Sequence, residues 1–95
     1  MRPDHGGRLE LKLTQSTAGS ARYLLTIFTP EAEVSSQVEV QVEGGALELG
    51  AWQGGSPPEW LETVARALLR TVWRSRTHDG DWPRRVTRWR PAPKS

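Results

Sequence analysis

The chain has 95 residues, with 13 lysines and arginines, 11 aspartates and glutamates, and a formal net charge of +2. A chain of this length forms one small domain around one hydrophobic core, which excludes a cofactor domain joined to a separate substrate domain. Because the sequence contains no cysteine, it also excludes a disulfide framework, a thiolate zinc site and a cysteine nucleophile.

Two segments near the N-terminus alternate between apolar and polar side chains, which is typical of half-buried strands. They are residues 8–15 and 22–29, and the turn residues 16–20 lie between them. Antiparallel pairing around this turn places apolar residues opposite each other throughout, which supports the register. The predicted pairs are Leu13 with Tyr23, Leu11 with Leu25, and Leu9 with Ile27.

A second hairpin is predicted from residues 37–43 and 46–52, after an acidic link at residues 31–35. Gly44 and Gly45 lie between these segments, and a two-residue type I′ turn needs positive φ angles at both of its positions. This turn predicts three inward-facing pairs: Val42 with Leu47, Val40 with Leu49, and Val38 with Ala51.

The next segment has the signals of a helix start. Ser56 and Glu59 have the spacing of a capping box, and Pro57 suits the first helical position. The helix is expected to run to about Arg76 and to stop at Gly80, a residue type that favours helix C-termini. Residues 85–90 then form a short candidate strand.

Together these elements predict an α+β fold of the order ββββαβ. One long helix covers a four-stranded antiparallel meander of two hairpins in a two-layer sandwich, and a short C-terminal strand follows. We expect a single domain over residues 8–90, a disordered N-terminus over residues 1–7 and a disordered tail over residues 91–95. The last strand pairs antiparallel beside the first strand or, as a less favoured alternative, parallel beside the fourth. The sequence also leaves open whether it joins the sheet of another subunit.

No catalytic or cofactor-binding pattern accompanies these elements. The two carboxylates that follow His78 are fewer than a calcium loop needs, and a helix C-terminal turn explains them without a metal. His5 lies far away in the glycine-flanked N-terminus. The sequence also lacks a P-loop, a dinucleotide-binding glycine motif and a serine nucleophile elbow. We therefore expect a protein that is not an enzyme and has no metal and no cofactor.

The charge is divided along the chain. Residues 1–56 contain four cationic and seven acidic residues, a net charge of −3, whereas residues 57–95 contain nine and four, a net charge of +5. On the predicted helix, arginines recur every four residues and form a cationic stripe. The candidate binding surface joins this stripe to the C-terminal Arg/Trp segment: Arg66, Arg70, Arg74, Trp82, Arg84, Arg85, Arg88, Trp89 and Arg90. A solvated helix face and a compositional bias toward arginine are the alternative explanations.

The apolar residues of the predicted helix spread over an arc of about 220°, whereas one covered face needs only about 100°. Two explanations are open. Either the sheet curls around the helix and the last strand covers one flank, or Trp60 or Trp73 remains at the surface as an apolar interface.

These observations favour a small non-enzymatic interaction module whose biological role and partner the sequence does not specify. The expected partner is another protein or a second copy of the chain, whose acidic half would contact the arginine stripe. No apolar run is long enough to span a membrane, and residues 1–7 are too polar for a signal peptide. We therefore expect a cytoplasmic protein with no membrane partner.

The alternative is a small nucleic-acid-binding protein. Its arginines would contact phosphates, and Trp82 and Trp89 would stack on bases. Acidic side chains on the predicted exposed sheet face argue against this use of the sheet, because they would repel phosphates. They are Glu39, Glu43 and Glu48.

Overall fold

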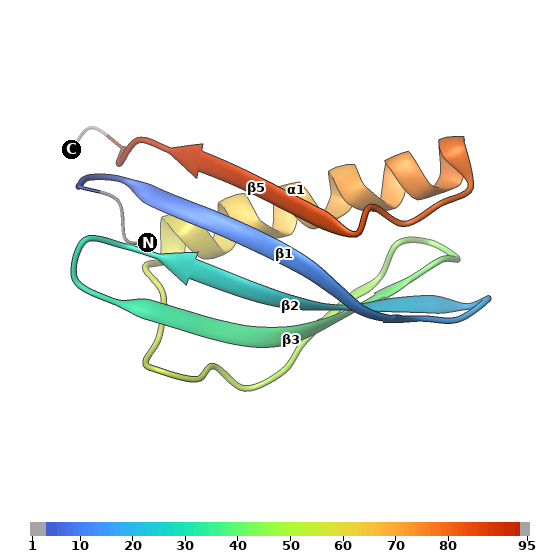
Figure 1. Ribbon diagram of the computed structural model, residues 1–95, viewed down its shortest axis with the longest axis horizontal. Coiled ribbons are helices and arrows are strands. Elements are labelled where there is room, and N and C mark those ends of the chain that lie inside the picture. Colours follow the sequence, from blue (N-terminus) through green and yellow to red (C-terminus); the bar gives the residue numbers. More distant parts are fainter. Residues whose placement is uncertain (1–3, 94–95) are drawn as a thin grey trace.

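The computed structural model describes residues 4–93, without the side chains of residues 77–79. It shows the predicted α+β fold, in which one long helix packs on one face of a five-stranded antiparallel sheet (Figure 1). The elements are β1 (Gly7–Ser16), β2 (Ser20–Phe28), β3 (Glu33–Gln41), β4 (Leu47–Leu49), α1 (Glu59–Asp79) and β5 (Arg85–Arg90). Disorder was expected at residues 1–7 and 91–95, and of these, residues 1–3 and 94–95 lie outside the described residues.

The C-terminal strand lies at one edge of the sheet, in the strand order β4-β3-β2-β1-β5. It pairs antiparallel with β1, and Val86 lies opposite Leu11. This confirms the predicted position beside the first strand, and it answers the question that the sequence left open, because β5 joins the sheet of its own chain. The alternative of parallel pairing beside the fourth strand is wrong.

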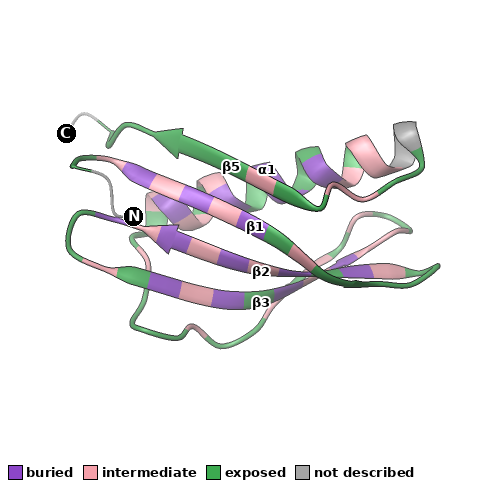
Figure 2. Cartoon of the chain, in the orientation of Figure 1, coloured by how far each residue is buried: buried purple, intermediate pink, exposed green. Residues whose placement is uncertain are grey.

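The core lies between the sheet and α1, and burial alternates along β1, β2 and β3 (Figure 2). The predicted register of the first hairpin is confirmed in all three of its apolar pairs. These pairs bury one face of the sheet, so a one-residue slip would expose the whole apolar set. The buried apolar residues are Leu9, Leu11, Ala21, Tyr23, Leu25, Ile27, Val34, Val38, Val40, Leu61, Ala65, Leu68, Leu69 and Val72.

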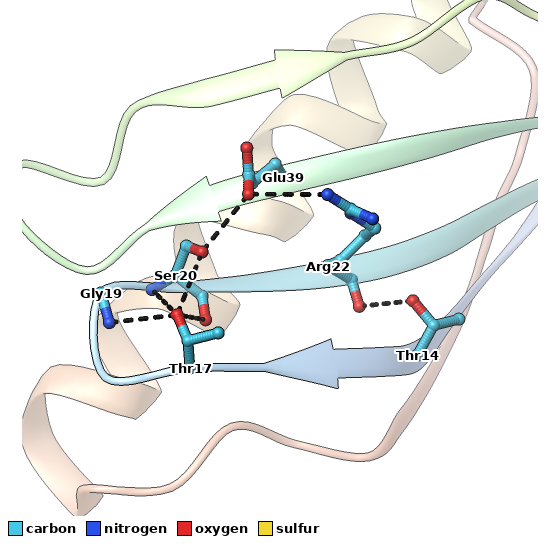
Figure 3. Close-up of polar contacts among 6 residues, drawn as sticks. All are labelled: Thr14, Thr17, Gly19, Ser20, Arg22 and Glu39. Atoms are coloured by element: carbon cyan, nitrogen blue, oxygen red, sulfur yellow. Dashed lines mark hydrogen bonds and ion pairs between the residues drawn. The ribbon is translucent and has the colours of Figure 1, made fainter.

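The β1–β2 loop is closed by polar side chains (Figure 3). The Thr17 hydroxyl oxygen accepts hydrogen bonds from the amides of Gly19 and Ser20, at 3.2 Å and 3.1 Å. A register shift between Leu13 and Gln15 precedes the loop, and the hydroxyl of the intervening Thr14 donates to the Arg22 carbonyl at 3.0 Å. The Thr14 hydroxyl therefore supplies a hydrogen bond between the two strands at the point where their register shifts.

The register of the second hairpin differs from the prediction by two residues. Val40, rather than Val42, lies opposite Leu47, so residues 42–45 form a four-residue loop in place of a two-residue turn. Val42 makes its hydrogen bonds elsewhere: its amide donates to the Gly19 carbonyl at 3.0 Å, and its carbonyl accepts the indole N–H of Trp73 at 2.7 Å. These long-range partners draw Val42 out of the hairpin ladder.

The positive φ angles expected at Gly44 and Gly45 are confirmed, at 78° and 69°. The returning strand is shorter than the predicted residues 46–52, because β4 ends at Leu49. The next residue, Gly50, packs so closely on β3 that a Cβ atom there would lie 3.2 Å from the Gln37 carbonyl oxygen. Beyond Gly50, the chain pairs with β3 at an isolated bridge between Ser35 and Gln53.

The helix starts later than the capping-box pattern predicts. It begins at Glu59, its N-cap is Pro58, and no side chain caps it, so the predicted capping box of Ser56 is wrong. The consecutive prolines explain the difference, because a residue that precedes a proline is disfavoured in the helical region and Pro57 precedes Pro58. The predicted stop is confirmed: Gly80 has a φ of 85°, and its amide donates to the Arg76 carbonyl.

Candidate interaction surface

The most exposed strand of the sheet is β5, in which only Val86 is partly buried. The amide of Leu13 donates to the Arg84 carbonyl at 2.8 Å, which identifies these two residues as a hydrogen-bonded pair. Such pairs alternate along an antiparallel ladder, so the backbone groups of Arg85, Thr87 and Trp89 point away from β1. The outer side of β5 is therefore an unpaired sheet edge.

Arginine side chains form hydrogen bonds with two of the outward carbonyl groups of this edge. The Arg88 guanidinium donates to the Thr87 carbonyl at 2.8 Å, and the Arg90 guanidinium donates to the Trp89 carbonyl at 2.9 Å. Within the described chain, the amides of Arg85, Thr87 and Trp89 have no such partner. We name the outward backbone groups of these three residues, with the side chains of Arg85, Arg88, Trp89 and Arg90, the β5 edge surface.

The side chains of β5 alternate between the two faces of the sheet. Trp89 lies opposite Arg8 and Arg85 opposite Lys12 on the face that α1 leaves open, whereas Arg88 lies opposite the buried Leu9 on the helix side. Arg85 also forms an ion pair with Glu10 at 3.3 Å. Both charges reach solvent, so this pair contributes at most about 1 kcal/mol of stability.

Trp89 is 43% exposed and stands out among the described residues as a large apolar side chain at the surface. Its indole N–H donates to the His5 carbonyl at 3.1 Å, and its ring meets the His5 ring edge-on at a centroid distance of 5.3 Å. These contacts hold the indole in place at the sheet edge. Tryptophan is among the residue types that are enriched in protein interfaces.

The arginine stripe of α1 lies away from the β5 edge surface. Arg66, Arg70 and Arg74 are exposed and line a hollow of about 490 Å³ together with residues 44–47 of the β3–β4 loop and β4. This loop is at the β4 end of the sheet, and β5 forms the opposite edge. The structure therefore divides the predicted binding surface into two separate arginine groups.

Trp82 belongs to neither group. It is partly buried, meets the Tyr23 ring edge-on at 6.3 Å, and has the Arg76 guanidinium 5.8 Å from its ring centre. The Tyr23 hydroxyl donates to the Pro83 carbonyl at 2.6 Å, and burial raises the pKa of Tyr23 to about 12. These contacts fasten the connection between α1 and β5 to the core. The neighbouring Arg84 is exposed.

The two helix tryptophans are both partly buried against the core. Trp73 lies under the β3–β4 loop, where its ring packs on Gly45 and its N–H bonds to Val42. This contact covers one flank of the wide apolar face of α1. The sequence contains both the glycine pair and the tryptophan, but no local pattern shows that they meet.

No protein-family model, curated protein or solved structure matches this chain. Among the described residues, no group of three or more histidines, aspartates or glutamates is arranged to hold a metal ion. The side chains of His78 and Asp79 lie outside the described part. Within that part, no helix has the length and apolar character needed to cross a membrane.

Proposed function

We propose that this protein is a non-enzymatic interaction module that binds an acidic, extended segment of a partner protein along the β5 edge surface. One observation carries the proposal. A six-residue strand ends the sheet with three outward amides that have no partner in the described structure, and arginine side chains surround them. An added strand would pair with these amides through its main chain.

The charge of the edge favours an acidic occupant. Arg85, Arg88 and Arg90 all lie on β5, in the half of the chain with a net charge of +5. A carboxylate beside an arginine forms a charge-assisted hydrogen bond, which is stronger than the neutral bond that a guanidinium makes to a carbonyl. Acidic side chains on the added strand would therefore draw Arg88 and Arg90 away from the carbonyls that they now cover.

The competing explanation for the arginines of β5 is that they protect this edge of the sheet from pairing. Charged side chains on an edge strand prevent unwanted pairing between sheets, and arginines folded over the carbonyls serve that purpose. This explanation predicts that every added strand is rejected, whatever its charge. The exposed indole of Trp89 favours binding, because protection alone needs no large apolar group at the edge.

Proline at Thr87 tests the proposal. Thr87→Pro removes an outward amide and leaves the bonds between β5 and β1 intact, because proline is tolerated where the N–H faces solvent. The probe is a fluorescently labelled peptide that alternates glutamate with valine, and its binding is followed by fluorescence anisotropy. The matched control is Thr87→Ala, which keeps the amide.

We expect the wild type and Thr87→Ala to bind this peptide alike, and Thr87→Pro to bind it about tenfold more weakly. A peptide that alternates lysine with valine should not bind. Equal binding by Thr87→Pro, or equal binding of the lysine peptide, would overturn the proposal. Light scattering that shows wild-type dimers, dissociated by Thr87→Pro without added peptide, would overturn the choice of a separate partner.

A further inference from the structure

The hollow between α1 and the β3–β4 loop lies on the side of the molecule away from the β5 edge surface. Arg66, Arg70 and Arg74 line it at intervals of one helical turn, and a second hollow of about 450 Å³ continues along the same three arginines. None of the described residues that line these hollows is acidic. Within the described residues, the guanidinium groups of Arg66 and Arg70 form no ion pair and no hydrogen bond.

The loop adds backbone donors to these charges. The amides of Gly44, Gly45 and Ala46, all residues that line the hollow, make no hydrogen bond to any other described residue. The loop is nevertheless anchored, because the Gln41 amide donates to the Ala46 carbonyl at 2.9 Å and Trp73 bonds to Val42 at 2.7 Å. Three available amides therefore lie in an anchored segment that lines the same hollow as the guanidinium groups of Arg66 and Arg70.

We propose that this hollow binds successive phosphate groups of a nucleic-acid backbone. Guanidinium groups and backbone amides are the donors that proteins use for phosphate oxygens. From Arg66 to Arg74 the helix rises about 12 Å, a length that suits a chain of phosphates better than a single small ion. The site is distinct from the β5 edge surface and does not depend on the function proposed for that edge.

Two double variants with the same net charge separate this site from general attraction to a basic protein. Arg66→Gln with Arg70→Gln removes two charges at the hollow, and Arg85→Gln with Arg88→Gln removes two charges at the β5 edge. All four side chains are exposed, so both variants should fold as the wild type does. Arg74 is left unchanged because it takes part in another interaction.

The probe is a labelled single-stranded oligonucleotide of about ten nucleotides, and its affinity is measured over a series of salt concentrations. For single strands, each lost phosphate contact lowers the slope of log affinity against log salt by about 0.7. We expect the hollow variant to lose at least about tenfold in affinity and to have a slope smaller by about 1.4. The edge variant should keep the wild-type slope.

Nuclear magnetic resonance gives a second readout. On titration with the oligonucleotide, the amide signals of Gly44, Gly45 and Ala46 should shift in the wild type and in the edge variant, and at the same oligonucleotide concentration should shift much less in the hollow variant. Equal loss of affinity in both variants would overturn the proposal, as would shifts confined to β5. Equally tight binding of inorganic phosphate, a phosphopeptide or polyglutamate would overturn the assignment to a nucleic-acid backbone.

Discussion

The contact between Gly45 and Trp73 should make two neighbouring glycines respond very differently to alanine. Both have positive φ angles, 78° at Gly44 and 69° at Gly45, and an L-residue in this region costs about 1–2 kcal/mol. A Cβ atom on Gly44 would meet nothing within 4 Å, so this conformational cost is the whole effect. A Cβ atom on Gly45 would lie 2.7 Å from Cδ2 of the Trp73 ring, which therefore has to move.

Moving that ring has a second cost. It disturbs the 2.7 Å hydrogen bond to Val42, worth about 0.5–1.5 kcal/mol, and the packing of a side chain that touches the core. We expect Gly45→Ala to destabilise the fold by about 1–3 kcal/mol more than Gly44→Ala does. Urea denaturation followed by circular dichroism measures both. Equal free energies of unfolding in the two variants would refute the structural role given to this contact.

Two further predictions concern the core. Because burial raises the pKa of Tyr23 from 10.0 to about 12, the unfolded chain loses this proton first as the pH rises. The stability that Tyr23 contributes is therefore complete below pH 10 and falls by at most about 2.7 kcal/mol toward pH 12. Because Tyr23 is the single tyrosine, its pKa can be measured by tyrosinate absorbance, and a midpoint near 10 would contradict the burial. Tyr23→Phe should remove the contribution of Tyr23 to the pH dependence of stability. Val40→Asp should unfold the protein, because it places an unpaired carboxylate at a fully buried position, whereas Gln37→Asp on the exposed side of β3 should leave thermal unfolding nearly unchanged. A folded Val40→Asp variant, observed by circular dichroism, would show that this position is not in the core.

Local sequence patterns correctly predicted the parts of the fold in which the burial of one face determines the strand register. The first hairpin has strict alternation on both strands, so only one register buries Leu11, Tyr23 and Leu25 together. The second hairpin was predicted from the alternation of its two strands together with the glycine pair between them, and a two-residue shift keeps the same side chains inward. Its register shifted because Val42 bonds to Gly19 and Trp73, which are distant in sequence and invisible to a turn rule.

The candidate site was less predictable for two physical reasons. The arginines of α1 and β5 are close in sequence, but the strand order places β5 beside β1 and the helix stripe beside the loop before β4. In addition, β5 has an apolar side chain on each face, Val86 on one and Trp89 on the other, so its sequence does not show which backbone groups face outward. That direction follows only from its pairing with β1.

Amide hydrogen exchange in β5, with and without the glutamate–valine peptide, tests the central claim most directly. In the free protein, the amides of Val86 and Arg88 should be protected by β1, and those of Arg85, Thr87 and Trp89 should exchange rapidly. With saturating peptide, the proposal predicts new protection at these three outward amides and little change elsewhere. Rapid exchange of all three in the bound protein would contradict the proposal that a partner adds a strand to this edge.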